Sequence, residues 1–549
     1  MGSQLKIGHL ILIFALAALP FAATFALYYP DERHYTDGAL MMLRHGDWLV
    51  PHTGAGAPRF EKPVLAYWTV AASWLIFGVN VLAARLPFLL AGCGTLWLTY
   101  RLARKLTGND RTALLAAVIL ASHPQFLLCS IRSMPDALLV FFVTLSAFGF
   151  LRLIAFNEFT SGAFWMAYGG AAGAVLSKGL LGAGIVLFAW GFAIWKQRDW
   201  RAVKKLIHPP SFVTAVVLAA GWFACILWLQ GKAALAVFFG DQVTGNMHGH
   251  FWSPVLRVPL FSLALAVNFL PWSLAAGELL MRKKTAAVEG MPGRAQQFIL
   301  AWTALLVIGF ALGQNVSLRY LLPATSLMAV LLASWLQNKE TAGLIFSVRR
   351  ILKVILALLL LMVVAALIIG FTWRLPVFMI ALAGAALVAG VFLLGTVALG
   401  KNRFPGMAAL GLALLFAWPV FFMAAMPVLL PDRAQQIATS LRGSSQNQAG
   451  PVLLVGDVKL ASRLRVLLGK DWTVAQTGKL NPADMTNFSR ILISEKDVSA
   501  SAAHGWKIQA AAVSYGVPPR AELWDALKSG ELRDTLARHG QKIYLATPE

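Results

Sequence analysis

Charged residues are scarce in this sequence, and acidic residues are scarcer than basic ones. Only 13% of its 549 residues are charged, whereas soluble domains usually carry about 25%. Hydrophobic residues make up 58% of the chain, and the mean hydropathy is +0.68. Apolar runs close to the roughly 18-residue length of a membrane span recur as far as residue 430. This composition excludes a soluble protein and predicts an α-helical polytopic membrane protein.

Cysteine is the next residue type that the sequence largely lacks. Cys93, Cys129 and Cys225 each lie in apolar surroundings, without the spacing of a metal site. We interpret them as packing residues and expect no disulfide framework.

The shortage of acid leaves a net charge of +23, because 47 Lys and Arg residues face 24 Asp and Glu residues. Such an excess can indicate nucleic-acid binding. Basic loops beside membrane helices have a simpler cause, since Lys and Arg are retained on the cytoplasmic side during insertion. We therefore expect membrane lipids, and no nucleic acid, among the partners.

We predict about thirteen transmembrane helices in residues 1–430. The first apolar run is too long for the core of a signal peptide and is interpreted as a retained span. The approximate ranges of the spans are 7–27, 79–100, 112–128, 137–156, 162–176, 179–195, 211–230, 256–279, 298–313, 319–337, 351–372, 376–398 and 405–428. Basic runs such as RLARKLTGNDR and KQRDWRAVKK fall on one side, which is therefore cytoplasmic. The odd number of spans then places the C-terminus outside.

Residues 431–549 differ in character from the membrane region. Short apolar runs alternate with amphipathic stretches such as AELWDALKSG and GELRDTLARHG, which predicts a small extracytoplasmic α/β domain. The apolar runs expected to form strands are PVLLVG, WTVAQTG, RILISE, WKIQAAAV and QKIYLA. No GxGxxG motif follows the first of them, so we expect no nucleotide cofactor.

The few acids of the membrane region gather on the side opposite to the basic loops. The first outer loop, residues 28–78, begins with YYPDERHYTDGALMML. The outward acids are Asp31, Glu32, Asp37, Asp47, Glu61, Asp136 and Asp241. Carboxylates near a membrane surface can accept a proton from a hydroxyl, or hold a divalent ion against a phosphate. The structural alternatives are helix capping by Asp31 or Glu32 and a surface ion pair between Glu61 and Lys62.

Five motifs spread along the membrane region carry a resemblance to one family. They are PDERHYTDGALMMLRHGDWLVPH…RFEKPVLAYW, AARLP, SMPDALL, SKGLLG and SLRYLLP. This series resembles the lipid-linked glycosyltransferases of the protein O-mannosyltransferase superfamily, and it is closest to the bacterial branch that transfers aminoarabinose to lipid A. The resemblance implies a GT-C fold, with a transmembrane domain at 1–430 and a periplasmic α/β domain at 431–549.

The same resemblance implies a reaction and a compartment. The donor would be a polyprenyl-phosphate sugar, and the acceptor would be lipid A, another envelope glycan or a protein. The protein would lie in the bacterial cytoplasmic (inner) membrane, with its active site on the periplasmic side.

Roles follow for residues that match the family's motifs. Asp31 and Asp136 are the predicted catalytic carboxylates, and Asp31 would orient or deprotonate the acceptor. The predicted substrate-binding residues are Glu32, Arg33, Lys62, Lys178, Arg319 and Tyr320. Glu61 matches a position that can contribute to a metal site, which Asp241 or His250 could complete for a divalent ion. His34 departs from the pattern, because the family usually has an arginine there.

Each of these roles has a structural alternative. Asp136 could cap the next span, Lys178 could extend to the membrane interface, and Arg319 with Tyr320 could anchor a helix end. Arg85 lies inside an apolar span, where a charge is costly, so we expect it to have a buried partner.

A transporter or flippase without bond-making chemistry is the alternative function. Many spans around a polar cavity would suit it equally well. The sequence shows no repeated half of the kind that transporters have, and the outward acids lie in loops rather than in the middle of spans. The motif series therefore favours an enzyme.

Overall fold

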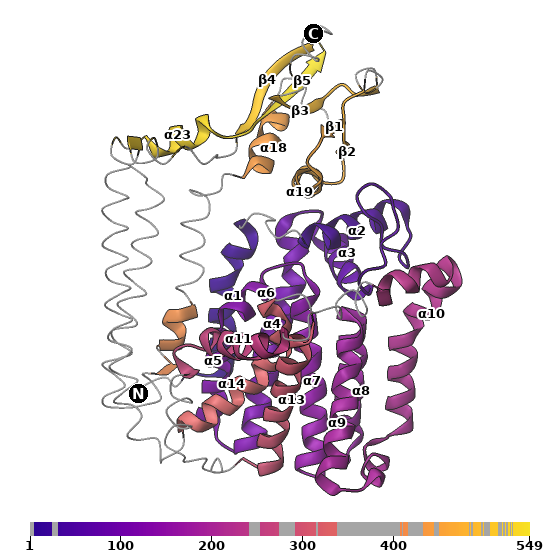
Figure 1. The fold of residues 1–549 in the computed structure, drawn as a ribbon, viewed down its shortest axis with the longest axis vertical. Helices are drawn as coiled ribbons and strands as arrows, with labels where there is room; N and C mark the ends of the chain where they lie inside the picture. The colour runs from indigo at the N-terminus through magenta and orange to yellow at the C-terminus, as the bar shows by residue number, and fades with distance from the viewer. Residues whose placement is uncertain are drawn as a thin grey trace.

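The computed structural model describes residues 5–24, 31–240, 253–273, 291–313 and 317–337, parts of 407–415, and most of 432–548. In this part of the chain, a small domain of strands and helices lies at one end of a helical bundle (Figure 1). The helices of the bundle are α1 Ile7–Thr24, α2 Glu32–His45, α3 Leu65–Phe77, α4 Val81–Thr107, α5 Asp110–Ala121, α6 Pro124–Ser130, α7 Pro135–Ala155, α8 Ser161–Lys178, α9 Leu180–Gln197, α10 Pro209–Phe239, α11 Ser253–Asn268, α13 Gly293–Ala311 and α14 Leu322–Gln337. Short 3-10 turns lie at Trp200–Ala202, Lys204–Leu206 and Leu318–Leu321.

Several described helices are long and apolar enough to cross a membrane. They are α4, α7, α9, residues 209–232 of α10, α13 and residues 319–337, which makes 6, or 7 if the bent pair α5 and α6 forms one span. These helices agree with the predicted multi-pass architecture. The predicted spans 351–372 and 376–398, and most of 405–428, lie outside the described residues, as does the predicted domain boundary at 430/431.

The span predicted at 112–128 is not one straight helix. The chain instead forms α5 and α6, whose axes are bent by 72°. A residue before proline is disfavoured in the α conformation, and His123, before Pro124, is extended with φ −75° and ψ 118°. The His123 side chain then accepts a hydrogen bond from the Phe126 amide at 3.2 Å and caps the second helix.

Small residues bring α7 and α8 into close contact. A Cβ atom at Gly149 would lie 2.3 Å from the Ala167 amide nitrogen, and one at Gly170 would lie 2.6 Å from the Ser146 amide nitrogen. Glycines at these two positions therefore let the backbones approach, as small residues do in membrane bundles. The contact aligns the start of α7 with the end of α8, where Asp136 and Lys178 lie.

The C-terminal domain confirms the predicted α/β pattern. Each apolar run forms a strand: β1 Pro451–Val455, β2 Thr473–Thr477, β3 Ile491–Ser494, β4 Trp506–Val513 and β5 Lys542–Pro548. The strands form one sheet in the order β2-β1-β3-β5-β4, parallel around β1 and antiparallel around β5. Its described helices are α18 Arg433–Gly443, α19 Val458–Leu468 and α23 Leu532–Arg538. The α19 helix faces α2 of the bundle (Figure 1).

Candidate active site

Asp31 lies at the end of the bundle that faces the α/β domain, directly before α2. Its Oδ2 accepts a hydrogen bond from Arg319 Nη2 at 3.1 Å, and its side chain is 45% exposed. Asp31 occupies the N-cap position of α2, but its side chain makes no capping hydrogen bond. Capping therefore does not account for this carboxylate, which remains accessible and beside a cation.

Asp136 lies close to the same cation, in the first turn of α7. Its carboxylate is almost fully buried, and it accepts a hydrogen bond from Lys178 Nζ at 2.5 Å, while Arg319 Nη1 lies 3.8 Å away. Lys178 ends α8, and its Nζ lies 5.6 Å from the centre of the Tyr320 ring. The Tyr320 ring stacks on Phe310 at 4.8 Å. The structure thus brings together five of the predicted site residues from widely separated segments. They are Asp31, Asp136, Lys178, Arg319 and Tyr320.

Lys62 reaches this group from the loop between α2 and α3. Burial and the positive charge of Lys178 lower the pKa of Lys62 to about 8, while the negative charge of Asp136 opposes the change. Three cations, Lys62, Lys178 and Arg319, therefore lie around the carboxylates of Asp31 and Asp136. A phosphate would be stabilised by cations arranged in this way.

Glu32 faces away from Asp31 into the bundle, and its predicted contact with substrate stays a prediction. Its carboxylate is fully buried and accepts hydrogen bonds from Arg85 Nε at 2.7 Å and Arg85 Nη2 at 2.9 Å. The Ser133 amide and hydroxyl bind the same carboxylate at 2.9 and 3.1 Å. Burial opposes ionisation, but Arg85 outweighs it and holds the pKa of Glu32 below its usual value. Glu32 is thus the partner expected for Arg85, and it ties α2 to α4 and to the segment before α7.

Arg33 and His34, the next residues of α2, are half-buried. Burial, together with the charges of Arg59 and Arg33, lowers the pKa of His34 to about 4, so the ring is neutral near pH 7. His34 therefore cannot supply the charge of the arginine that the family has at this position. The Arg33 Nε is buried without a hydrogen-bond partner among the described residues, and its predicted contact with substrate stays a prediction.

Glu61 is paired with a different residue from the one expected. Its two oxygens accept hydrogen bonds from Arg59 at 2.6 and 3.2 Å, rather than from Lys62. The described residues contain no group of three or more His, Cys, Asp and Glu side chains that could hold a metal ion. Asp241 and His250 lie outside the described residues. The Arg59 guanidinium on both Glu61 oxygens would compete with a metal ion, and the divalent-ion site stays a prediction.

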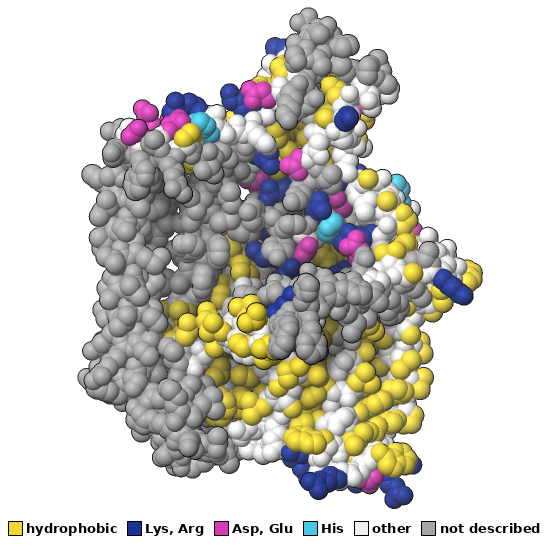
Figure 2. Space-filling model, in the orientation of Figure 1, with side chains coloured by type: hydrophobic (Ala, Val, Ile, Leu, Met, Phe, Trp, Pro, Cys, Tyr) yellow, Lys and Arg dark blue, Asp and Glu magenta, His cyan; other side chains and the backbone are white. Residues whose placement is uncertain are grey.

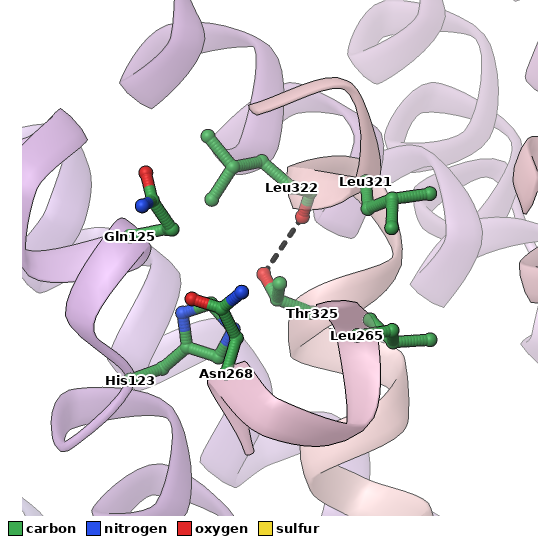
Figure 3. A pocket seen from close by; sticks show the side chains of 7 residues that line it. All are labelled: His123, Gln125, Leu265, Asn268, Leu321, Leu322 and Thr325. Atoms are coloured by element: carbon green, nitrogen blue, oxygen red, sulfur yellow. Dashed lines mark hydrogen bonds between the residues drawn. The ribbon is translucent and has the colours of Figure 1, made fainter. Parts of the chain in front are cut away.

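A pocket lies at the break between α5 and α6. It is lined by His123, Gln125, Leu265, Asn268, Leu321, Leu322 and Thr325 (Figure 3). Thr325 donates a hydrogen bond to the Leu322 carbonyl at 2.7 Å. The lining has amide, imidazole and hydroxyl groups but no carboxylate, Lys or Arg. It offers no cation for a phosphate, so the group around Asp31 is the stronger candidate.

Several known proteins are similar to this chain. Residues 5–236 match the family model described as dolichyl-phosphate-mannose-protein mannosyltransferase. An uncharacterised protein of Aquifex aeolicus (strain VF5) is 30% identical over 57% of this chain and 60% of its own length. The undecaprenyl phosphate-alpha-4-amino-4-deoxy-L-arabinose arabinosyl transferase of Pseudomonas aeruginosa (strain LESB58) is 28% identical over 78% of this chain and 77% of its own length. The chain thus spans less than two thirds of the length of the Aquifex protein and more than two thirds of the length of the Pseudomonas transferase.

A solved structure matches the fold over nearly the whole chain. The crystal structure of ArnT from Cupriavidus metallidurans bound to undecaprenyl phosphate has a TM-score of 0.70, at 17% identity, and covers 98% of both chains. The chain therefore has the fold of a multi-pass membrane protein of the GT-C type. Residues 5–236 thus resemble the protein O-mannosyltransferase family, and 78% of the chain is similar to the aminoarabinose transferase of Pseudomonas aeruginosa.

Proposed function

We propose that this protein is a glycosyltransferase that moves a sugar from a polyprenyl-phosphate donor to an envelope acceptor, namely lipid A, another glycan or a protein. The observation that carries the proposal is the accessible carboxylate of Asp31, 3.1 Å from Arg319, beside the buried pair of Asp136 and Lys178. The Pseudomonas relative is a transferase whose name includes undecaprenyl phosphate. None of the matches reported above points to a transporter.

The cations would bind the donor phosphate and stabilise it as it leaves. During transfer, the bond between the anomeric carbon and the phosphate oxygen breaks, and polyprenyl phosphate departs with the electron pair. Arg319, Lys178 and Lys62 would stabilise this developing charge. Asp136, between Lys178 and Arg319, would keep two of these side chains in place.

Asp31 would act on the acceptor. A hydroxyl oxygen that attacks the anomeric carbon must lose its proton, and Asp31 can accept that proton. An acceptor phosphate is already ionised, so Asp31 would then orient the acceptor. A phosphate that engages Arg319 would compete for the hydrogen bond that Asp31 now accepts, which would leave the Asp31 carboxylate ready for the acceptor.

We further propose that the site faces the periplasm. Charged side chains gather between the α/β domain and the hydrophobic belt of the bundle, and more Lys and Arg side chains lie at the opposite end (Figure 2). Those opposite residues include Lys196, Arg201, Lys204 and Lys205, near the end of α9. The positive-inside rule favours the cytoplasm for them. Nucleotide sugars are absent from the periplasmic side, which supports a lipid-phosphate donor.

Sugar transfer by the purified full-length protein in liposomes tests the proposal. We would supply labelled polyprenyl-phosphate sugars together with lipid A or an envelope extract, and separate the products. The label is expected to move to an acceptor, and the labelled product identifies that acceptor. If no donor gives transfer while labelled lipid crosses the bilayer, the protein is a transporter and the proposal is wrong.

The pKa of about 8 for Lys62 predicts a pH dependence of donor binding. Lys62 is cationic below pH 8 and loses its charge above it, so its attraction for a phosphate is present at pH 7 and lost by pH 9. We expect the KM for the donor to rise up to roughly tenfold between pH 7 and pH 9. Lys62→Arg stays charged over this range and should give a flatter profile. An equally steep rise in Lys62→Arg would show that another group titrates.

A further inference from the structure

The α/β domain touches α2, the helix that begins directly after Asp31, at three points along its length. Ser462 of α19 donates a hydrogen bond to the Arg33 carbonyl at 3.4 Å. Arg465, one turn further along α19, binds Asp37 at 3.0 Å. At the far end of α2, Arg44 donates to the Trp472 carbonyl at 2.8 Å. The domain therefore follows the whole helix rather than a single point on it.

The central contact is a buried ion pair between residues that are far apart in sequence. The Arg465 side chain is 1% exposed and that of Asp37 is 9% exposed. Two bonds within the domain fix the guanidinium: Nε donates to the Val474 carbonyl at 3.1 Å, and Nη2 donates to Gln476 Oε1 at 3.2 Å. Because β2 holds the guanidinium, the remaining nitrogen can fix the position of the Asp37 carboxylate, and α2 with it.

The loop between α2 and α3 closes over this pair. A Cβ atom at Gly54 would lie 1.9 Å from Arg465 Nη1 and 2.7 Å from Asp37 Oδ2. Glycine is therefore required for the loop to cover the pair without displacing the guanidinium.

The opposite side of α2 is held by the membrane bundle. Glu32 binds Arg85 of α4, and the Tyr35 ring lies 5.1 Å from the ring of Tyr67 in α3. Asp31 lies next to these contacts and about 9 Å along the helix from Asp37, at 1.5 Å per residue. A rotation or shift of α2 would move Asp31 relative to Arg319. The position of the reactive carboxylate thus depends on contacts from both domains.

We infer that Arg465 is a positioning residue for sugar transfer, through which the α/β domain holds α2 and with it Asp31. The inference rests on the proposed function, and it gives the C-terminal domain a role in the chemical step. A displacement of about 1 Å far from the reacting atoms can lower a rate by about 10²-fold. The donor phosphate is bound by Lys62, Lys178 and Arg319, which do not lie on α2, so donor binding should change little.

The test compares Arg465→Met with Arg463→Met in the full-length protein. Arg463 is on the same helix, but its guanidinium lies 3.9 Å from Asp432 within the α/β domain. We expect Arg465→Met to lower kcat per folded protein by about 10- to 100-fold, with the KM for the donor within about twofold of wild type. Amide hydrogen exchange in residues 32–45 should become faster in this variant. Arg463→Met should change neither property.

Gly54→Ala keeps every charge and provides a second test of the same contact in case the Arg465 variant does not fold. The added methyl group should push the flexible guanidinium away from Asp37 and cause a smaller fall in kcat in the same direction. Wild-type kcat together with wild-type exchange in residues 32–45 for Arg465→Met would overturn the inference, as would an equal fall in Arg463→Met. If the wild-type protein transfers no sugar, the proposed function fails. The amide hydrogen exchange of α2 then decides by itself whether Arg465 holds the helix.

Discussion

Replacement of Asp31 by Asn should lower kcat for transfer to a hydroxyl acceptor by about 10²- to 10⁴-fold, the usual contribution of a general base. The amide keeps the size of the side chain but cannot accept the proton of the acceptor. The Asp31 side chain is 45% exposed and makes no capping bond to α2, so the fold should tolerate the change. Transfer of labelled sugar per folded protein is the measurement.

Asp47→Asn is the matched control for Asp31→Asn. Asp47 lies in the same outer loop, and its Oδ1 accepts hydrogen bonds from the amides of Leu49 and Val50, both at 3.1 Å. An amide oxygen can accept the same bonds, so this variant should transfer sugar at the wild-type rate. Equal rates in Asp31→Asn and wild type would show that Asp31 is structural. A fall to the same level in both variants would indicate a general effect of charge in the loop.

Replacement of Glu32 by Gln should cause the largest loss of stability, on the order of 3–5 kcal/mol. Both members of the Glu32–Arg85 pair are buried, with side chains 1% and 0% exposed. The Glu32→Gln change removes the counter-charge that Glu32 gives to the guanidinium of Arg85 in a region of low dielectric constant. Unfolding of the purified protein in detergent, by heat or by denaturant, measures the loss of stability.

A double variant separates the effect of an uncompensated charge from a simple loss of packing. Glu32→Gln combined with Arg85→Met removes both charges, and such neutral replacements are often close to neutral in stability. We therefore expect the double variant to recover much of the loss. Glu158→Gln is the matched control, because Glu158 pairs with Lys105 and Arg152 in a more exposed position and should cost at most about 1 kcal/mol. A double variant less stable than Glu32→Gln would contradict this account.

Hydropathy predicted the long apolar helices of the described residues, but it did not predict the break between α5 and α6. The stretch at 112–128 is apolar on average, and its mean hydropathy does not register the effect of Pro124 on His123. The five strands of the C-terminal domain were all found, because each is a short apolar run bounded by polar residues. These signals lie within single segments and can be read without knowing what each segment packs against.

The resemblance carried by short motifs pointed to part of the charged group. The motif SMPDALL contains Asp136, and SKGLLG contains Lys178, and the structure brings these two residues to 2.5 Å. Arg85 in an apolar span signalled a buried partner without identifying it. The partner, Glu32, lies 53 residues away and was expected to contact substrate. Neither the pairing of Glu61 with Arg59 nor that of Asp37 with Arg465 was predicted.

The sequence by itself determined that this is a multi-pass membrane protein with an α/β domain at its C-terminus, and it identified the segments that carry the charged site. Composition and periodicity are properties of local stretches, so they survive without a fold. The tertiary structure decided which carboxylate each cation binds, because Asp37 and Arg465 are 428 residues apart and meet only when two domains pack together. Burial then separated Asp31, which stays accessible, from its neighbour Glu32, which stabilises the bundle.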